Sequence, residues 1–400
     1  MDDGPAGSSL EDSRAQSTVH RALQRVRPAN MLTTSRHFGV HMPGPLAGIR
    51  IVELAGLGPV PFAVNMLANM GAEVVRISRP PSNPAALTGW SPFLGTEVYA
   101  DLKNPDDVAM VIELVESADV FLEGMRPGVT ERLGLGPDVC LAHNSRLIYG
   151  RMTGWGQEGP MAKMAGHDIN YIGLTGVLHA IGPKEAPVPP MSFIGDYGGG
   201  SLFLIVGILT ALFERTTTGR GQVIDAAVVD GASVLMQPFL EMSNGGAFST
   251  ERESNQLDGG APYYRVYECR DGKFMAVGAM EPQFYSAFVK VLGLEESELL
   301  NRDDRTNWLA LREQFAAIFA TDDRDNWTAR FEGIDACVTP VLTHLEAPDH
   351  PHMKARGTIT RRNGELKAAP APRLSAHPQH LNEARSGTKS TLPEVVARWK

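Results

Sequence analysis

The stretch Ile49-Arg50-Ile51-Val52-Glu53-Leu54, followed by residues 62–70 and then by Glu73-Val74-Val75-Arg76-Ile77, decides the fold class. The two apolar runs are rich in β-branched residues and predict strands, while the segment between them predicts a helix. A strand, a helix and a second strand in this order make the unit from which open parallel sheets are built.

The same alternation continues through the first half of the chain. Further strands are predicted at 118–122, 147–152 and 222–226, and helices at 106–117, 198–215 and 228–242. Strands that alternate with helices are joined by crossover connections, so the first half predicts a Rossmann-like α/β domain with a parallel sheet.

The pattern changes near residue 259 to that of a smaller α+β domain. A hairpin is predicted at 263–269 and 273–278, helices at 283–292 and 308–320, and a strand at 337–342. The expected organisation is a large domain (43–228), a linker helix (229–258), a small domain (259–365) and a C-terminal segment (366–400) that returns toward the large domain. Residues 1–42 are polar and predict a disordered extension, with Met31 and Met42 as alternative start sites.

The composition narrows the class of protein. The net charge of -9 and the pI of 5.7 give no overall basic field, which makes nucleic acid an unexpected partner and leaves phosphate binding to local arginines. No apolar run reaches the roughly 18–20 residues of a membrane span. The three cysteines are widely spaced and predict buried thiols in the cytoplasm.

Two side chains suggest acid–base chemistry. His167 follows a glycine and precedes a helical pattern at 168–178, and Asp196 begins a glycine run before the apolar helix. An imidazole and a carboxylate can both exchange protons, and glycines leave room for a substrate. The alternative interpretations are a structural histidine and a helix N-cap aspartate.

Three arginines are candidate phosphate contacts. The turn at 56–61 resembles a dinucleotide fingerprint only weakly, because Pro61 stands at the third glycine position. Arg79 follows the second strand and suits a phosphate on an adenosine ribose, as in NADP or coenzyme A. Arg126 and Arg132 follow the next predicted strand, at the usual ligand edge of a parallel sheet. The alternative for each is an exposed, solvated charge.

At these residues the chain resembles the family III CoA-transferase (CaiB/BaiF) superfamily and, within it, the α-methylacyl-CoA racemases. The resemblance covers about residues 43–360 and is carried by the stretches Ala165–Tyr171, Leu257–Tyr263 and Met280–Tyr285. It implies interlocked homodimers, each chain having a Rossmann-like large domain and a small domain, with the site between the subunits. It also implies no metal and no cofactor, since coenzyme A is part of the substrate.

The resemblance assigns roles to individual residues. His167 and Asp196 would be the two acid/base groups on opposite faces of the substrate α-carbon, and Glu281 of the partner subunit would pair with His167. The implied CoA-binding residues are Arg79, Tyr99, Ala100, Asp101, Leu102, Gly124, Met125, Arg126, Arg132, Gly166, Asp168, Ile169, Asn170 and Tyr171. The chain departs from the family where a basic stretch is usual, since residues 90–97 read Trp-Ser-Pro-Phe-Leu-Gly-Thr-Glu.

The implied reaction is a 1,1-proton transfer on 2-methylacyl-CoA thioesters, an isomerase step of fatty acid and lipid metabolism. One group removes the α-proton, backbone N–H groups at the start of the helix after His167 stabilise the enolate oxygen, and the other group returns a proton from the opposite face. Branched fatty acids, steroid side chains and bile-acid intermediates all remain open as acyl groups. Two alternatives are a CoA-transferase with Asp196 as nucleophile, and an NADP-binding oxidoreductase or non-catalytic nucleotide-binding module.

Overall fold

The computed structural model describes residues 44–80, 93–362, 364–377 and 387–400. The predicted N-terminal extension and residues 90–92 of the departing stretch lie outside these ranges.

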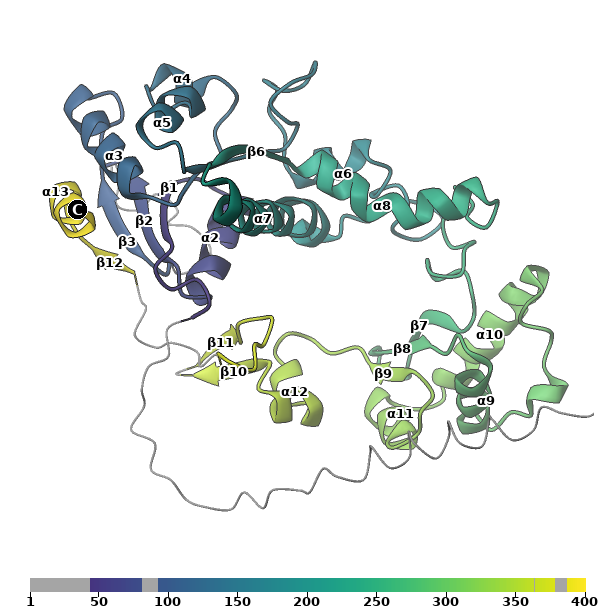
Figure 1. The fold of residues 1–400 in the computed structure, drawn as a ribbon. Helices are drawn as coiled ribbons and strands as arrows, with labels where there is room; N and C mark the ends of the chain where they lie inside the picture. The colour runs from purple at the N-terminus through teal and green to yellow at the C-terminus, as the bar shows by residue number, and fades with distance from the viewer. Residues whose placement is uncertain (1–43, 81–92, 363, 378–386) are drawn as a thin grey trace, which may run out of the picture. The chain divides into compact units, whose positions relative to one another are not determined.

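The largest sheet has seven parallel strands, in the order β12-β3-β2-β1-β4-β5-β6. Figure 1 labels five of them, β12, β3, β2, β1 and β6. The strand order reverses between β1 and β4, and such switch points are where open α/β sheets bind ligands. The Rossmann-like prediction is therefore confirmed. The strands are β1 (Arg50–Leu54), β2 (Glu73–Ser78), β3 (Thr96–Tyr99), β4 (Val120–Glu123), β5 (Ile148–Thr153), β6 (Gln222–Ala227) and β12 (Thr388–Lys389).

Helices cover both faces of this sheet because its strands are apolar on both sides. Ile51 of β1 belongs to the core beneath α2 (Pro59–Asn69) and α7 (Phe203–Thr218), whereas the next residue, Val52, belongs to the opposite core. Side chains of a strand alternate between faces, so one strand supplies both cores. The opposite core is closed by α3 (Pro105–Ser117), α5 (Pro137–His143) and α13 (Leu392–Trp399).

The apolar helix predicted at 198–215 is longer than expected. It continues a short 3₁₀ turn, η1 (Met191–Phe193), and a π-helical segment, η2 (Ile194–Leu202), before α7 begins. Asp196 therefore lies inside a helical segment and is not its N-cap. The whole stretch Met191–Thr218 is long and apolar enough to cross a membrane by length and composition, but Leu204 and Ile208 of α7 are buried against the sheet. We interpret α7 as a core helix.

Close helix packing explains part of the glycine run. A Cβ on Gly199 would lie 2.6 Å from the backbone nitrogen of Ala232, and one on Gly231 would lie 1.9 Å from the carbonyl oxygen of Gly199. The two glycines thus let η2 and α8 (Val228–Asn244) touch through their backbones. The expectation that this run leaves space for substrate is wrong at Gly199.

The second half contains a three-stranded antiparallel sheet of β7 (Tyr264–Glu268), β8 (Phe274–Gly278) and β9 (Val338–Pro340). The predicted hairpin is confirmed. Its core is aromatic, with Phe288 stacked on Phe319 and Phe331 and edge to face with Phe315. The helices here are α9 (Pro282–Val291), α10 (Trp308–Phe319) and α11 (Arg324–Phe331), with 3₁₀ turns η3 (Glu296–Glu298) and η4 (Arg305–Asn307). Cys140 and Cys269 are buried as predicted, whereas Cys337 is exposed, which corrects that expectation.

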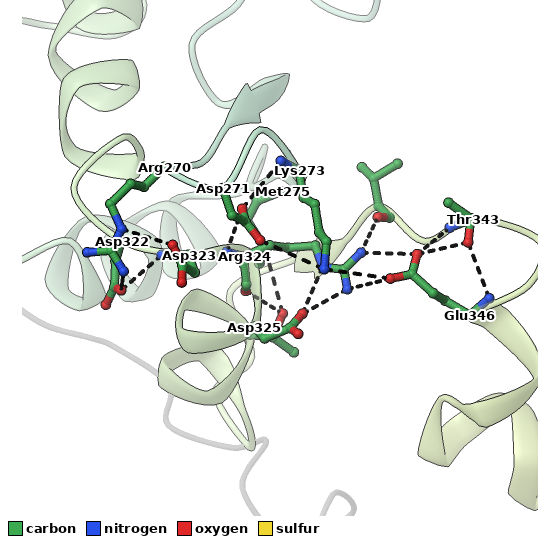
Figure 2. Close-up of polar contacts among 12 residues, drawn as sticks. Arg270, Asp271, Lys273, Met275, Asp322, Asp323, Arg324, Asp325, Thr343 and Glu346 are labelled. Carbon is green, nitrogen blue, oxygen red and sulfur yellow. Dashed lines mark hydrogen bonds and ion pairs between the residues drawn. The ribbon is translucent and has the colours of Figure 1, made fainter.

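A buried arginine fastens three segments around this sheet (Figure 2). The guanidinium of Arg324, which is 5% exposed, donates to the Glu346 carboxylate at 2.9 Å, to the Val341 carbonyl at 3.1 Å and to Asp325 at 2.9 Å. Its backbone N–H donates to Asp271 in the hairpin turn at 3.2 Å. The cluster ties the hairpin turn, the start of α11 and the chain leaving β9 together.

The chain beyond β9 forms η5 (Ala347–Asp349), α12 (Pro351–Arg356) and a hairpin of β10 (Ile359–Arg362) and β11 (Glu365–Ala368). It then adds β12 beside β3 and packs α13 on α3 (Figure 1). The Trp399 indole N–H donates to Glu73 at 2.8 Å, and the Arg50 guanidinium donates to the Trp399 carbonyl at 2.7 Å. Residues far apart in sequence thus complete one sheet.

Candidate active site

Two neighbouring cavities open at the carboxyl edge of the parallel sheet. Cavity 1, of about 270 Å³, is lined by the turn after β4, the end of β5 and the turn after it, residues 162 and 164–167, and Tyr171. Cavity 2, of about 310 Å³, is lined by residues at the ends of β1, β2 and β3. Met125 lines both cavities, so the turn after β4 is their common wall. This is the ligand edge expected for the fold.

The cavities bring together nine of the predicted residues. Cavity 1 is lined by Gly124, Met125, Arg126, Gly166, His167 and Tyr171, and cavity 2 by Arg79, Ala100, Leu102 and Met125. The remaining predicted residues line neither cavity: Tyr99, Asp101, Arg132, Asp168, Ile169, Asn170, Asp196 and Glu281.

His167 is the N-cap of α6 (Asp168–Leu174) and is exposed at the wall of cavity 1. Its backbone N–H donates to the Asn170 side chain at 3.0 Å, which fixes the start of the helix. The predicted helix start is correct, but the helix ends earlier than residue 178. Gly176 has a φ of 83°, in the left-handed region that ends a helix.

Trp155, which the sequence analysis did not single out, forms an aromatic pair with the predicted Tyr171 near His167. The Tyr171 hydroxyl donates to the Gly166 carbonyl, and its ring meets Trp155 edge to face at 4.7 Å. A Cβ on Gly154 would lie 1.9 Å from the Tyr171 ring, so only glycine fits there. Trp155 lines cavity 1 in the turn after β5, and an aromatic residue shortly after a predicted strand was the available signal.

Asp168 connects His167 to Asp196. Its buried carboxylate accepts hydrogen bonds from the backbone N–H groups of Asp196, at 2.7 Å, and of Gly195. A Cβ on Gly195 would lie 2.1 Å from the Asp168 carboxylate oxygen, so glycine at 195 makes this contact possible. The segment that carries Asp196 is therefore tied to the residue next to His167.

The surroundings of Asp196 favour its protonated form. Burial raises the pKa of Asp196, and the negative charge of Asp168 raises it further. A hydrogen bond from Ser192 and the charge of His167 act in the opposite direction. Burial likewise raises the pKa of Asp168, against the hydrogen bonds from the backbone. A carboxyl group whose pKa moves toward neutral pH is suited to both giving and taking a proton.

The first βα turn lies beside Asp196. Gly58, the N-cap of α2, has a φ of 76°, and the point where its Cβ would stand is 3.8 Å from an Asp196 carboxylate oxygen. Next to them, Tyr197 stacks on Phe62 of α2 at 4.5 Å. The turn that resembles a dinucleotide fingerprint thus packs against the carboxylate that sequence reasoning singled out.

Two of the predicted residues outside the cavities lie against the backbone of nearby turns. Asp101 accepts a hydrogen bond from the Lys103 N–H at 3.1 Å, and its own N–H donates to Asp107 at 2.7 Å. Arg132 ends α4 (Val129–Arg132), and its Nη1 lies 3.3 Å from where a Cβ on Gly128 would stand.

Residues 93–97 are the described part of the stretch that departs from the family pattern, and they make contacts with β2. The Arg76 guanidinium packs over the Phe93 ring at 3.9 Å, and Glu97 accepts a hydrogen bond from Ser78 at 2.7 Å.

Glu281 is the exposed N-cap of α9. The stretches Leu257–Tyr263 and Met280–Tyr285, which precede and follow the β7–β8 hairpin, meet near Glu281. They are joined by the Arg302 guanidinium, which stacks over Tyr285 at 4.3 Å and over Tyr263 at 5.0 Å. Arg302 also donates to the Ala279 carbonyl at 3.3 Å, two residues before Glu281. The pairing of Glu281 with His167 of a second subunit stays a prediction.

Comparisons with known proteins agree with this geometry. The sequence matches the family described as CoA-transferase family III over residues 46–395. It is 46% identical over 338 residues to the alpha-methylacyl-CoA racemase of Mus musculus, covering 83% of this chain and 87% of that protein. It is 44% identical over 334 residues to the alpha-methylacyl-CoA racemase of Homo sapiens, covering 82% and 86%.

A solved structure has the same fold. The crystal structure of a CAIB/BAIF family protein from Brucella suis superposes with a TM-score of 0.74 at 23% identity, covering 90% of this chain and all of that one. The family match spans residues 46–395, and the identities to the two relatives extend over most of both chains. The protein belongs to CoA-transferase family III.

Proposed function

We propose that this protein is an α-methylacyl-CoA racemase, which inverts the α-carbon of 2-methylacyl-CoA thioesters by 1,1-proton transfer. The observation that carries the proposal is the Asp168 carboxylate, which follows His167 in the chain and holds the backbone of Asp196. An imidazole and a carboxyl group on two elements joined in this way suit a reaction that needs one group on each face of a carbon. The names of the two relatives support the same activity.

The chemistry follows from the acidity of the substrate. An α-hydrogen beside a thioester is weakly acidic, so its removal needs a positioned base and stabilisation of the enolate oxygen. In one direction His167 takes the proton, and Asp196 in its protonated form gives one to the opposite face of the planar enolate. In the other direction the two groups exchange roles, and ionised Asp196 takes the proton that His167 in its protonated form replaces. The raised pKa of Asp196 keeps the protonated form, which the first direction needs, accessible.

The cavities suggest where coenzyme A lies. Arg79 at cavity 2 and Arg126 at cavity 1 are exposed cations that suit the phosphates of the nucleotide. A pantetheine arm that passes Met125 from cavity 2 would bring the thioester to His167 in cavity 1. Glu281 of a partner subunit would then orient the His167 imidazole from the other side.

Deuterium exchange tests the proposal. A single enantiomer of a 2-methylacyl-CoA is incubated with the enzyme in deuterium oxide, and α-deuterium uptake and optical purity are followed together. A racemase gives uptake with loss of optical purity. A CoA-transferase with Asp196 as nucleophile gives exchange of CoA with a free acid and no uptake, and an NADP-dependent enzyme binds NADPH in place of acetyl-CoA.

Matched histidine variants complete the experiment. H167A should abolish both exchange and racemisation, whereas H143A should keep both, because His143 is an exposed histidine paired with Glu116 on α3. Full activity of H167A would refute the assignment. The interlocked homodimer, the cytoplasmic location and the absence of any cofactor besides the substrate's own CoA belong to the same proposal; sedimentation of the purified protein tests the first of them.

A further inference from the structure

A buried carboxylate holds the turn that separates the two cavities. Glu123 is the last residue of β4 and is 0% exposed. Its Oε2 accepts a hydrogen bond from the Met125 backbone N–H at 2.6 Å, and its Oε1 accepts one from Arg151 Nε at 3.0 Å. Glu123 and Arg151 are direct partners on the neighbouring strands β4 and β5. The carboxylate thus fixes the turn at the point where it leaves the sheet.

The same arginine holds the far end of the turn. Arg151 Nη1 lies 2.8 Å from the Glu131 carboxylate, and Glu131 belongs to α4, which the turn leads into. Between the two carboxylates the chain passes through Gly128, whose φ of 82° permits the tight return. One guanidinium therefore clamps the entry and the exit of residues 124–128.

Stability alone is a weak reason for this arrangement. Burying a carboxylate and a guanidinium removes both from water, and such a buried pair is commonly no more stabilising than apolar side chains of similar size. Burial raises the pKa of Glu123 in spite of its partners, and Arg151 Nη2 is a buried donor without a hydrogen-bond partner among the described residues. The defined geometry of the network is therefore what its function must explain.

The turn that this carboxylate and guanidinium network holds is part of the wall of both cavities. Gly124, Met125, Arg126 and Pro127 line cavity 1, and Met125 also lines cavity 2. We propose that Glu123, Arg151 and Glu131, hereafter the turn brace, are positioning residues that hold this turn in place for acyl-CoA. The inference rests on the proposed function, since it assigns the cavities to acyl-CoA.

The other face of the sheet supplies a matched control. Glu53 of β1 is also 0% exposed and pairs with Arg76 of the adjacent strand through two bonds, at 2.8 and 3.1 Å. Burial raises the pKa of Glu53 as it does that of Glu123. The contacts described for the Glu53 carboxylate are with Arg76 and not with the turn. E53Q therefore perturbs a buried ion pair whose own side chains line neither cavity.

The test compares E123Q and E131Q with E53Q and E116Q in the full-length enzyme. Calorimetry gives the Kd of CoA, deuterium exchange gives KM and kcat, and thermal scans give the unfolding midpoint. E123Q and E131Q should each raise KM and the Kd of CoA by about 10-fold, with a smaller change in kcat. E53Q should lower the unfolding midpoint and leave both constants near the wild-type values. E116Q, on the exposed face of α3, should change neither the unfolding midpoint nor the two constants, KM and the Kd of CoA.

Glu131 keeps the test decisive if E123Q does not fold. Its side chain is 43% exposed, so E131Q should keep the wild-type unfolding midpoint while KM rises. A folded E131Q with wild-type KM and Kd overturns the proposal, and so does an E53Q whose KM rises as much as that of E123Q. Wild-type protein that binds CoA without α-deuterium uptake refutes the racemase alone, because the Kd comparison still decides the turn brace. Wild-type protein that binds no CoA refutes both.

Discussion

The carboxylate of Asp168 accepts a 2.7 Å hydrogen bond from the backbone N–H of Asp196, 28 residues further along the chain. Because Asp168 directly follows His167, this bond sets the spacing between the two proposed acid/base groups. Proton transfer depends steeply on the placement of donor and acceptor, so the bond belongs to the machinery of the reaction although Asp168 itself need not exchange a proton.

Removal of this bond should reduce turnover more than binding. D168A deletes both accepted hydrogen bonds and is expected to lower kcat by about 100-fold with a smaller change in KM. D168N keeps one acceptor oxygen and should give an intermediate loss. Deuterium exchange measures both constants, and D106N, a change of the same kind in the first turn of α3, should behave like wild type. Equal kcat for D168A and D106N would contradict the prediction.

A methyl group at position 195 should act like the loss of Asp168. The added Cβ of G195A would stand 2.1 Å from the Asp168 carboxylate and must displace it, at a cost of about 1–3 kcal/mol of unfolding free energy. G173A is the control, because its Cβ inside α6 would meet its nearest neighbour only at 4.0 Å. The midpoint temperature of thermal unfolding and kcat should both fall in G195A. In G173A both should stay at the wild-type value or rise. A fully active G195A would disprove the contact.

The pH dependence of turnover should report the Asp168 charge. Where Asp196 acts as base it must be ionised, so kcat rises as pH rises through its raised pKa; where it acts as acid, kcat falls over the same interval. D168N removes a neighbouring negative charge that raises this pKa, so the transition should move to lower pH for both enantiomers. Profiles of kcat against pH from each enantiomer test this, and an unmoved midpoint would refute it.

The arginine cluster of Figure 2 should make the unfolding temperature sensitive to acid. Hydrogen bonds from Arg324 and Thr343 lower the pKa of Glu346 from 4.5 to about 2. A carboxylate with a lowered pKa stabilises the folded state above pH 4.5, and this contribution disappears as the pH falls toward 2. E346Q should therefore unfold at lower temperature at pH 7, with a smaller difference from wild type at pH 3.

Calorimetry at the two pH values checks the Glu346 prediction. The control is E365Q, because Glu365 is an exposed residue whose ion pair with Lys367 spans 3.4 Å. Exposed pairs of this kind contribute little to stability. The explanation fails if E346Q and E365Q unfold alike at pH 7.

The sequence predicted the parts of the fold that local patterns encode. Strands β1, β2, β4, β5 and β6 are rich in apolar residues, and together with the alternating helix pattern they predict a parallel sheet. Strand β3 was missed because Thr96–Tyr99 is short and polar at two of its four positions. Its partner β12 lies about 290 residues away, and no local pattern announces such a pairing.

The candidate site likewise combines residues that a local sequence pattern predicts with contacts between distant segments that it does not predict. His167 was predictable at a helix start, because a glycine before an N-cap and a helical pattern after it are local signals. The helical placement of Asp196 was not, since a glycine run favours a turn until Gly199 packs on α8. The contact of Asp168 with Gly195 and Asp196 joins distant segments and is visible only in three dimensions. The domain boundaries and the role of Glu281 stay predictions.

The edge of the large sheet has a consequence for biosynthesis. Strand β1 begins at Arg50, yet β12 and α13, which pack beside β3 and on α3, are made only after residue 387. The ribosome therefore extrudes the three-stranded sheet and its aromatic core before the seven-stranded sheet can be completed. Until then the apolar side of α3 that Val395 and Trp399 will cover stays open to water and to chaperones.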